Sequence, residues 1–161
     1  MFYENIVRPF LFALSKRDPE VAHGWALTAL HVLGQCGIFR RLIAKHYLVE
    51  ASQLVHEAFG VHFQNPVGLA AGFDKNGGAL KGLEALGFGF IELGTVTRHA
   101  QPGNLRPRMF RLLEDKALIN RMGFNNEGAD AVAARLKKMG KLSIPLGISI
   151  GKSKITPLEE A

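Results

Sequence analysis

A lysine that follows an apolar run is the first residue whose type and position point to ligand binding. Lys75 comes after residues 67–71 and after Gly72, where the missing side chain would let a flat ligand approach the backbone. A lysine in such a place could pair with a carboxylate or with an electron-rich edge of a cofactor. The competing interpretation is a solvated surface lysine, the commonest environment of this residue type.

A group of amide side chains around Gly123 forms the second candidate. Asn120, Asn125 and Asn126 lie close together in sequence with Arg121, so hydrogen-bond donors and acceptors are concentrated there. Such groups suit the recognition of a polar, planar ring through paired hydrogen bonds. Asparagine and glycine also form turns, so an ordinary turn explains the same composition. The sequence leaves both interpretations open.

A third candidate is Thr95, which follows a glycine at the end of another apolar run. Its hydroxyl could reach a phosphate or a ring oxygen, although β-propensity alone also explains a threonine there. The six histidines have no spacing that would gather metal ligands, so we expect no metal ion. The sequence contains neither a Walker-type phosphate loop nor a dinucleotide-binding fingerprint. From the residues alone, the site would take an anionic, planar ligand.

Apolar runs that alternate with helical patterns predict the elements that must position these residues. Such alternation is typical of an α/β fold with a parallel sheet. Because functional-looking residues follow each strand, we expect the first part of a (β/α)8 TIM barrel, with about three of its eight units. The predicted strands are 67–71, 88–96 and 145–151, the helices are 76–86 and 128–139, a further helix starts at 156, and hairpins cover 54–63 and 108–120.

The N-terminal part of the sequence predicts a small helical domain before the barrel. Residues 1–16, 18–34 and 38–46 place apolar side chains at helical spacing, and Asp18 followed by Pro19 is a typical helix start. Large aromatic side chains with basic flanks have two interpretations. They could form an ordinary helical hairpin packed on a core, or an amphipathic patch in a membrane interface. The sequence alone does not decide between them.

The composition describes a globular chain without a membrane span. Of the 161 residues, 47% are hydrophobic and 21% are charged, which excludes a disordered protein. The single Cys36 excludes an intrachain disulfide framework and suits a reducing cytosol. No apolar run approaches the roughly 20 residues of a spanning helix, and the N-terminus lacks the features of a signal peptide. The net charge of +6 is spread along the chain, so we expect no nucleic-acid partner.

Several stretches together resemble the quinone-dependent (class 2) dihydroorotate dehydrogenases, which are flavoenzymes of pyrimidine synthesis. Each stretch alone is a weak signal, but their order and spacing are highly specific, and the resemblance covers essentially the whole chain. The stretches are DPEVAH (18–23), NPVGLAAGFDK (65–75), GFGFIELGTVT (87–97), QPGN (101–104), RPRMFR (106–111), INRMGFNN (119–126) and LGISIGKSK (146–154).

The resemblance implies two domains and a set of site residues. Residues 1–50 would form an amphipathic helical domain that contacts the membrane and admits the quinone. Residues 51–161 would form the first part of the FMN-binding (β/α)8 barrel. The implied residues are Ala71, Gly72, Phe73, Asp74, Lys75, Thr95 and Ser149 for FMN, then Lys75, Asn120, Arg121, Met122, Gly123 and Phe124 for dihydroorotate or orotate, and His23 and Arg111 for the quinone tunnel.

The implied reaction is the oxidation of dihydroorotate to orotate. A serine base would take the C5 proton, FMN would accept the C6 hydride, and a membrane quinone would receive the electrons. That serine is expected beyond Ala161, so no catalytic base is assigned here, and we expect weak or no activity from the isolated 161-residue chain. Ser149 departs from the asparagine common in the family, so its contact with FMN would have a shorter reach or pass through water.

The resemblance also implies a location and leaves two alternatives. The protein would lie peripherally on the cytoplasmic face of the cell membrane. One alternative is a non-catalytic, membrane-associated half-barrel. The other is a class 1 relative with a soluble electron acceptor, but such relatives lack the N-terminal helices, so residues 1–46 count against it.

Overall fold

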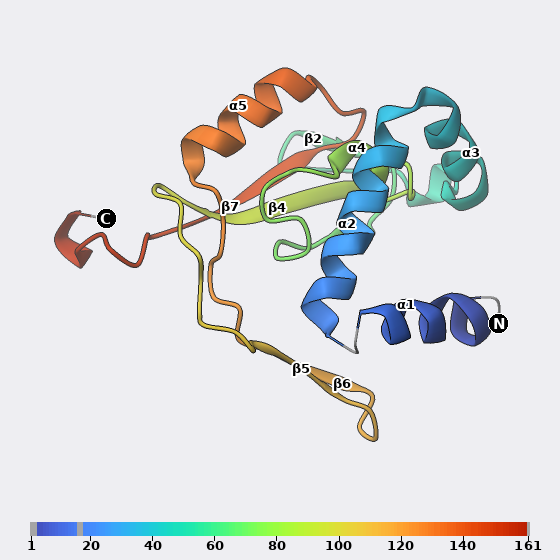
Figure 1. Cartoon of the computed structure of the whole chain (residues 1–161). Coiled ribbons are helices and arrows are strands. Elements are labelled where there is room, and N and C mark those ends of the chain that lie inside the picture. Colours follow the sequence, from blue (N-terminus) through green and yellow to red (C-terminus); the bar gives the residue numbers. More distant parts are fainter. Residues whose placement is uncertain (1–2, 16–17, 161) are drawn as a thin grey trace.

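The fold is built on a three-stranded parallel sheet, which lies at the centre of Figure 1. The structure is a computed structural model that describes residues 3–15 and 18–160. The predicted α/β class with a parallel sheet is confirmed. The strands are hydrogen-bonded in the order β3 (Gly68–Leu69), β4 (Phe90–Thr97) and β7 (Leu146–Gly151).

Two helices connect the parallel strands in the predicted order. Helix α4 (Leu80–Glu84) joins β3 to β4, and α5 (Ala129–Met139) lies between β4 and β7. The prediction that the first of these helices starts at residue 76 is wrong. The Asp74 carboxylate accepts hydrogen bonds from the backbone N–H groups of Gly78 at 3.0 Å and Ala79 at 2.7 Å, and these bonds hold the preceding residues in a loop.

The core lies where α4 and α5 meet the sheet. Leu80 and Leu83 of α4 pack with Ile91 and Leu93 of β4, and all four are at most 1% exposed. Val132 brings α5 into the same cluster. Burying a leucine or isoleucine side chain contributes about 1.5–3 kcal/mol, so this cluster is the main support of the strands that carry the site.

Both predicted hairpins form as antiparallel pairs. The first pairs β1 (His56–Ala58) with β2 (Val61–Phe63), and the second pairs β5 (Met109–Leu112) with β6 (Ala117–Asn120). The second hairpin is inserted between β4 and α5 and projects away from the sheet (Figure 1).

Three helical segments precede the sheet, as predicted. A π-helical turn, η1 (Tyr3–Val7), runs into α1 (Arg8–Leu14), and residues 1–2 and 16 of the first predicted helix lie outside the described residues. The next helices are α2 (Pro19–Gln35) and α3 (Gly37–Tyr47), followed by a short 3-10 turn, η2 (Ser52–Leu54). A second 3-10 turn, η3 (Leu158–Glu160), lies after β7, where the sequence predicts a helix start at residue 156.

The start of α2 follows the predicted capping chemistry. Asp18 Oδ1 accepts hydrogen bonds from the backbone N–H groups of Glu20 at 2.8 Å and Val21 at 3.3 Å, and Pro19 occupies the first turn. These bonds satisfy backbone donors that a helix start would otherwise leave unpaired.

Helix α2 packs closely on α4 through two glycines. A Cβ atom on Gly34 would lie 2.6 Å from the backbone nitrogen of Gly82, and one on Gly82 would lie 2.2 Å from the carbonyl oxygen of Leu30. Any larger side chain would force the helices apart, so this contact fixes α2 against the sheet domain.

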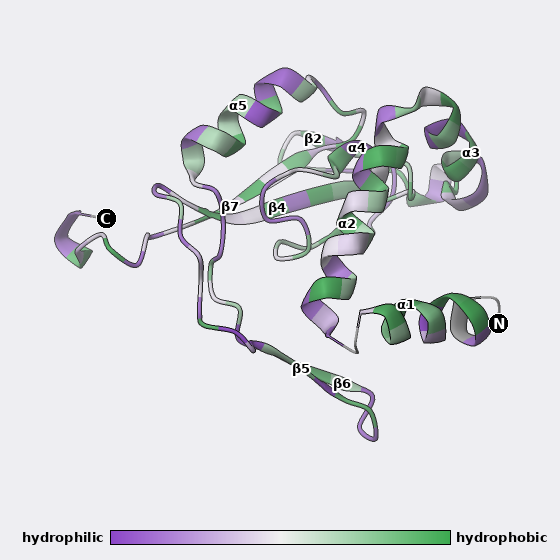
Figure 2. Cartoon of the chain, viewed as in Figure 1, coloured by the Kyte–Doolittle hydropathy of each residue, from purple (hydrophilic) through white to green (hydrophobic). Residues whose placement is uncertain are grey.

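Helices α1 and α3 leave many apolar side chains uncovered, and the green bands of Figure 2 mark their hydrophobic residues. Phe10 on α1 and Ile38 and Leu42 on α3 are all more than half exposed. Among the residues that the structure describes, no helix has the length and apolar character to cross a membrane.

Candidate functional site

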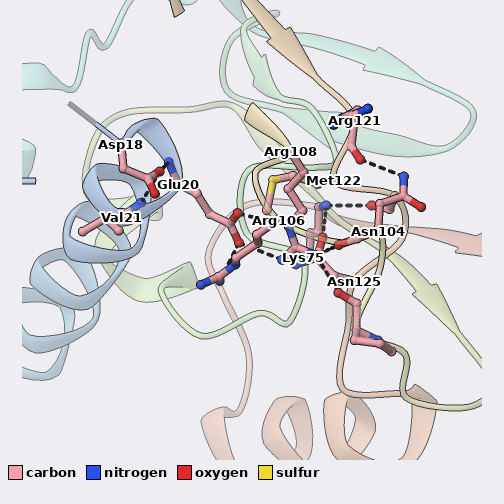
Figure 3. Close-up of polar contacts among 12 residues, drawn as sticks. Asp18, Glu20, Val21, Lys75, Asn104, Arg106, Arg108, Arg121, Met122 and Asn125 are labelled. Carbon is pink, nitrogen blue, oxygen red and sulfur yellow. Dashed lines mark hydrogen bonds and ion pairs between the residues drawn. The ribbon is translucent and has the colours of Figure 1, made fainter. Parts of the chain in front are cut away.

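The ammonium group of Lys75 is held by the amide-rich loop that follows β6 (Figure 3). Its Nζ donates hydrogen bonds to the carbonyl oxygen of Gly123 at 3.0 Å and to Asn125 Oδ1 at 2.7 Å. The side chain is half-buried, so the interpretation as a solvated lysine is wrong. The lysine and the amide group that the sequence singled out separately therefore belong to one place in the fold.

The surroundings of Lys75 make its proton easier to lose. Burial lowers the pKa of the ammonium group, the positive charge of Arg108 lowers it further, and Glu20 acts in the opposite direction. Lysines perturbed in this way are enriched at ligand sites and also occur in structural ion-pair networks. A carboxylate ligand placed against the ammonium would favour the charged form again.

The amides of the loop divide into two roles. Asn120 Oδ1 accepts a hydrogen bond from the backbone N–H of Met122 at 2.9 Å, which shapes a turn. Asn126 is buried, and its Nδ2 donates to Thr97 Oγ1 at 2.9 Å. Asn125 is the amide that meets the lysine. Asn120 and Asn126 thus both shape turns, since Asn126 Oδ1 also accepts from the N–H of Gly128 at 2.9 Å, and Asn120 in addition lines a cavity described below.

The other predicted residues of this loop differ in their environment. Met122 is buried, whereas Phe124 is half exposed. The guanidinium of Arg121 donates to the carbonyl oxygen of Pro107 at 3.2 Å and lies 5.2 Å from the centre of the Phe110 ring. The Arg121 side chain is therefore directed to the β5–β6 hairpin, away from Lys75.

Two hydroxyl groups meet on neighbouring strands of the sheet. Thr95 Oγ1 on β4 and Ser149 Oγ on β7 are 2.9 Å apart. Gly94 permits this approach, because a Cβ atom there would lie 2.5 Å from the carbonyl oxygen of Ser149, and its φ of 112° favours glycine. The pair offers a ligand two adjacent groups that can both donate and accept hydrogen bonds.

The loop between β3 and α4 has a backbone that is open beside Gly72. This residue has a φ of 107°, and apart from its chain neighbours no atom of the described residues lies within 4 Å of the place where its Cβ would be. Its N–H donates to the carbonyl oxygen of Gly94 at 2.7 Å, which holds the loop against β4. Asp74 is buried, and its carboxylate is engaged by the N–H groups of the loop, so its side chain shapes the loop.

A cavity of about 950 Å³ joins this loop to the N-terminal helices. Ala71, Gly72 and Phe73 line it together with His23 from α2 and Arg111 from β5. Asn120 and Met122 line it as well. Some of the residues predicted for the flavin, the substrate and the quinone therefore share one hollow, although its lining does not include Lys75, Thr95 or Ser149.

The two residues predicted for the quinone tunnel also make specific contacts. His23 Nε2 lies 2.8 Å from the carbonyl oxygen of Phe73, and the two rings meet edge to face with their centres 5.0 Å apart. The guanidinium of Arg111 lies 3.6 Å from the centre of the Phe12 ring, a cation–π contact. These contacts tie α2 to the loop before α4, and α1 to the β5–β6 hairpin.

An ion pair that nothing in the sequence marks joins α2 to the segment before β5 (Figure 3). Glu20 accepts hydrogen bonds from Arg108 Nη2 at 2.7 Å and Nε at 3.0 Å, and from Arg106 Nη2 at 2.7 Å. The hydrogen bond from Arg108 lowers the pKa of the Glu20 carboxyl. The partners are 88 positions apart, and nothing in a single sequence marks them as a pair.

The arrangement fits a planar, hydrogen-bonding cofactor such as the predicted FMN. The open backbone at Gly72 and the Thr95–Ser149 hydroxyl pair provide a flat approach and polar contacts, and Lys75 supplies a positive charge. Among residues 3–15 and 18–160, no three His, Cys, Asp or Glu side chains come together as a metal site.

Comparison with known proteins gives a consistent result. The sequence model of the family described as dihydroorotate dehydrogenase matches residues 53–161. The chain is 51% identical to a dihydroorotate dehydrogenase (quinone) of Chloroflexus aurantiacus over 161 residues, which are all of this chain and 44% of that protein. It is 54% identical to the protein of the same name from Salinispora arenicola over 162 residues, with 100% of this chain and 47% of that protein covered.

A solved structure shares the fold as well. The crystal structure of DHODH from Eimeria tenella in complex with ferulenol matches with a TM-score of 0.68 and 40% sequence identity, over 87% of this chain and 37% of that one. The chain thus spans less than half the length of the relatives it matches. On these matches and the geometry above, the chain belongs to the dihydroorotate dehydrogenase family.

Proposed function

We propose that this chain provides the N-terminal part of an enzyme that oxidises dihydroorotate to orotate, with FMN as cofactor and a membrane quinone as electron acceptor. In this proposal residues 51–161 are the first part of a (β/α)8 barrel, and residues 1–50 are the domain through which the quinone arrives. The observation that carries the proposal is the single cavity lined by residues 71–73 together with His23 and Arg111.

The substrate side of the proposal rests on charge and shape. Orotate is a planar ring with a carboxylate and amide edges, and Lys75 supplies the complementary charge. Asn125 and Asn120 lie in the loop that holds the lysine, so they could offer amide groups to the ring. Residues 121–124 would complete the same wall, with Gly123 contributing its backbone.

The cofactor side rests on the open loop and the hydroxyl pair. Dihydroorotate dehydrogenases are generally flavin-dependent, and we assign FMN to residues 71–75 with Thr95 and Ser149. FMN would supply the hydride-accepting chemistry, while the protein holds and orients the reactants. Ser149 Oγ is engaged with Thr95 Oγ1 at 2.9 Å, so the two hydroxyls would act on the flavin as a pair.

The acceptor side rests on the exposed apolar side chains of the N-terminal helices. Uncovered side chains such as Phe10 and Leu42 favour contact with the apolar part of a bilayer. Basic residues on α3, among them Arg40 and Arg41, favour anionic headgroups. A lipid-soluble quinone entering from the bilayer would reach the cavity beside His23 and Arg111. We place the protein on the cytoplasmic face.

The test is an acceptor comparison with the complete gene product that contains this chain. Orotate formation is followed with dihydroorotate and either a short-chain ubiquinone analogue, fumarate or NAD⁺. We expect turnover with the quinone to exceed turnover with either soluble acceptor by at least about tenfold, a difference of about 1.4 kcal/mol in the activation barrier. Turnover supported only by fumarate or NAD⁺ would contradict the quinone assignment, and no orotate with any acceptor would contradict the activity itself.

A further inference from the structure

The Glu20–Arg108 pair connects a helix of the N-terminal segment to the loop that holds Lys75. We propose that this ion pair is a positioning pair for the substrate site, although neither residue contacts Lys75 through a hydrogen bond. The inference rests on the proposed function, in which Lys75 binds the carboxylate of the substrate.

The first step of the connection is the Arg108 guanidinium, whose three nitrogen atoms all donate hydrogen bonds. The Arg108 side chain is 7% exposed and that of Glu20 is 12% exposed. Arg108 Nε and Nη2 donate to the two carboxylate oxygens, a forked geometry that fixes the direction of both side chains. The backbone of Glu20 is fixed in turn, because its N–H donates to Asp18 Oδ1, which caps the first turn of α2.

The second step runs from the guanidinium into a backbone loop. Arg108 Nη1 donates to the carbonyl oxygen of Pro102 at 2.6 Å and to that of Asn104 at 2.9 Å. Between them, Gly103 lies so close that a Cβ atom would be 2.3 Å from the carbonyl oxygen of Met122. The guanidinium thus holds residues 102–104 flat against the loop after β6.

The third step reaches the ammonium group (Figure 3). The N–H of Asn104 donates to the carbonyl oxygen of Met122 at 2.9 Å, and Asn104 Nδ2 donates to that of Arg121 at 2.8 Å. The next carbonyl group, that of Gly123, accepts the hydrogen bond from Lys75 Nζ. A shift of residues 102–104 would therefore move an acceptor of the lysine.

The exposed Arg106 supplies a matched control. It donates to the same Glu20 oxygen at the same 2.7 Å, but its side chain is 69% exposed, and no hydrogen bond from it to residues 102–104 is found in the described part of the chain. If the pair acts by positioning the loop, Glu20→Gln should perturb the site, whereas Arg106→Gln should not. Arg108→Lys keeps the charge but loses the fork, so it should resemble Glu20→Gln.

The first measurement is hydrogen exchange of the complete gene product without substrate. We expect Glu20→Gln and Arg108→Lys to speed exchange of the amides of Asn104 and Arg121 at least about tenfold, while Arg106→Gln leaves them unchanged. Equal exchange in Glu20→Gln and Arg106→Gln would overturn the proposal. This result does not depend on enzymatic activity.

The second measurement separates positioning from general stability. In steady-state kinetics, Glu20→Gln should raise KM for dihydroorotate about 10- to 100-fold, as misplacement of a substrate-holding group does, with KM for the quinone unchanged. Arg106→Gln should leave both constants unchanged. An equal rise of both constants, or no rise with an active wild type, would overturn the proposal. An inactive wild type would contradict the proposed function, and the hydrogen-exchange result would still decide on the pair.

Discussion

The N-terminal helices and the sheet domain use apolar residues in opposite ways. Leu83 and Leu93 of the sheet domain are at most 1% exposed, whereas Phe10 of α1 and Leu42 of α3 are 67% and 59% exposed. Apolar side chains that are left uncovered in this number commonly mark an interaction surface. The comparison teaches that α1 and α3 leave many of their apolar side chains uncovered, whereas those of α4 and β4 build the core, to which α2 adds Leu27 and Leu30.

The sheet domain also differs from helices α1 and α3 in its buried polar side chains. Around the sheet edge, buried polar side chains such as Asn126 and Arg108 are fully engaged by the chain itself. Within the described residues, no buried side-chain nitrogen or oxygen lacks a hydrogen-bond partner. Such satisfied networks hold a site rigidly. Helices α1 and α3 therefore present exposed apolar side chains, and the sheet edge presents preorganised polar groups.

The largest expected effect is on stability and distinguishes the two regions directly. Leu93→Ala should lower the free energy of unfolding by about 3 kcal/mol, because it leaves a cavity in the core. Leu42→Ala should lower it by less than about 1 kcal/mol, since that side chain is exposed. Urea denaturation of both variants of the complete gene product measures the difference. Equal losses would mean that α3 is part of the same core.

A large effect on ligand binding is expected at Lys75. Lys75→Met should weaken orotate binding about 30-fold, since a hydrogen bond to a charged group contributes about 1.5–3 kcal/mol. The exposed Lys137 on α5 is the control, and Lys137→Met should leave the affinity unchanged. Isothermal titration calorimetry with orotate measures both, and an unchanged affinity in Lys75→Met would remove the lysine from the substrate site.

The lowered pKa of Lys75 gives the site a pH dependence of defined sign. The protonated amine is the form that attracts a carboxylate, and burial and Arg108 shift its loss to lower pH than for an ordinary lysine near 10.4. Orotate affinity should therefore fall, by up to about tenfold per pH unit, as pH rises through the lowered pKa. In Lys75→Met this fall should vanish. A rise in affinity with pH would contradict the assignment.

The exposed apolar face of the helices should matter for membranes and little for folding. Replacing Ile38 and Leu42 together by serine should reduce binding to anionic vesicles at least about tenfold, because each buried apolar side chain contributes about 1.5–3 kcal/mol. Vesicle sedimentation checks this. As a matched control, the similarly exposed Leu158 in η3 is changed to serine, with no expected effect. Retained vesicle binding in the double variant would place the membrane contact elsewhere.

The smallest expected effect is at the hydroxyl pair. Thr95→Val keeps the shape of the side chain and removes one hydroxyl, so FMN affinity should fall about fivefold, in line with about 1 kcal/mol for one hydrogen bond. Ser149→Ala should have a similar effect. The double variant should lose less than the sum of the two, because the groups act as a pair. Fluorescence titration with FMN tests this, and full additivity would mean that the hydroxyls act independently.

The helices and strands could be predicted from the sequence where local residues determine them, but not where a side chain bonds to backbone groups several residues away. The α2 start was predictable because Asp18 and Pro19 carry their own local chemistry. The late start of α4 could not be predicted from the spacing of apolar residues. It depends on the Asp74 carboxylate, which binds the N–H groups of Gly78 and Ala79. The parallel order of the strands followed from the alternation of elements.

The sequence was enough to predict which residues belong to the candidate site, but not which of them contact one another. Lys75 and the amide loop were both singled out, but nothing local could tell that Asn125, rather than Asn120, meets the lysine. The Glu20–Arg108 pair went unnoticed because a long-range ion pair leaves no periodic pattern in one sequence. Only the folded chain brings those charges together.

The most direct test of the account is to separate the two half-reactions in the complete gene product by stopped-flow absorbance. The account predicts that Lys75→Met slows flavin reduction by dihydroorotate much more than reoxidation by the quinone, because Lys75 is assigned to the substrate as well as to the flavin. It predicts the reverse for Arg111→Met, which alters the cavity beside the N-terminal helices. If both variants slowed the same half-reaction, the division between a polar substrate side and an apolar acceptor side would be wrong.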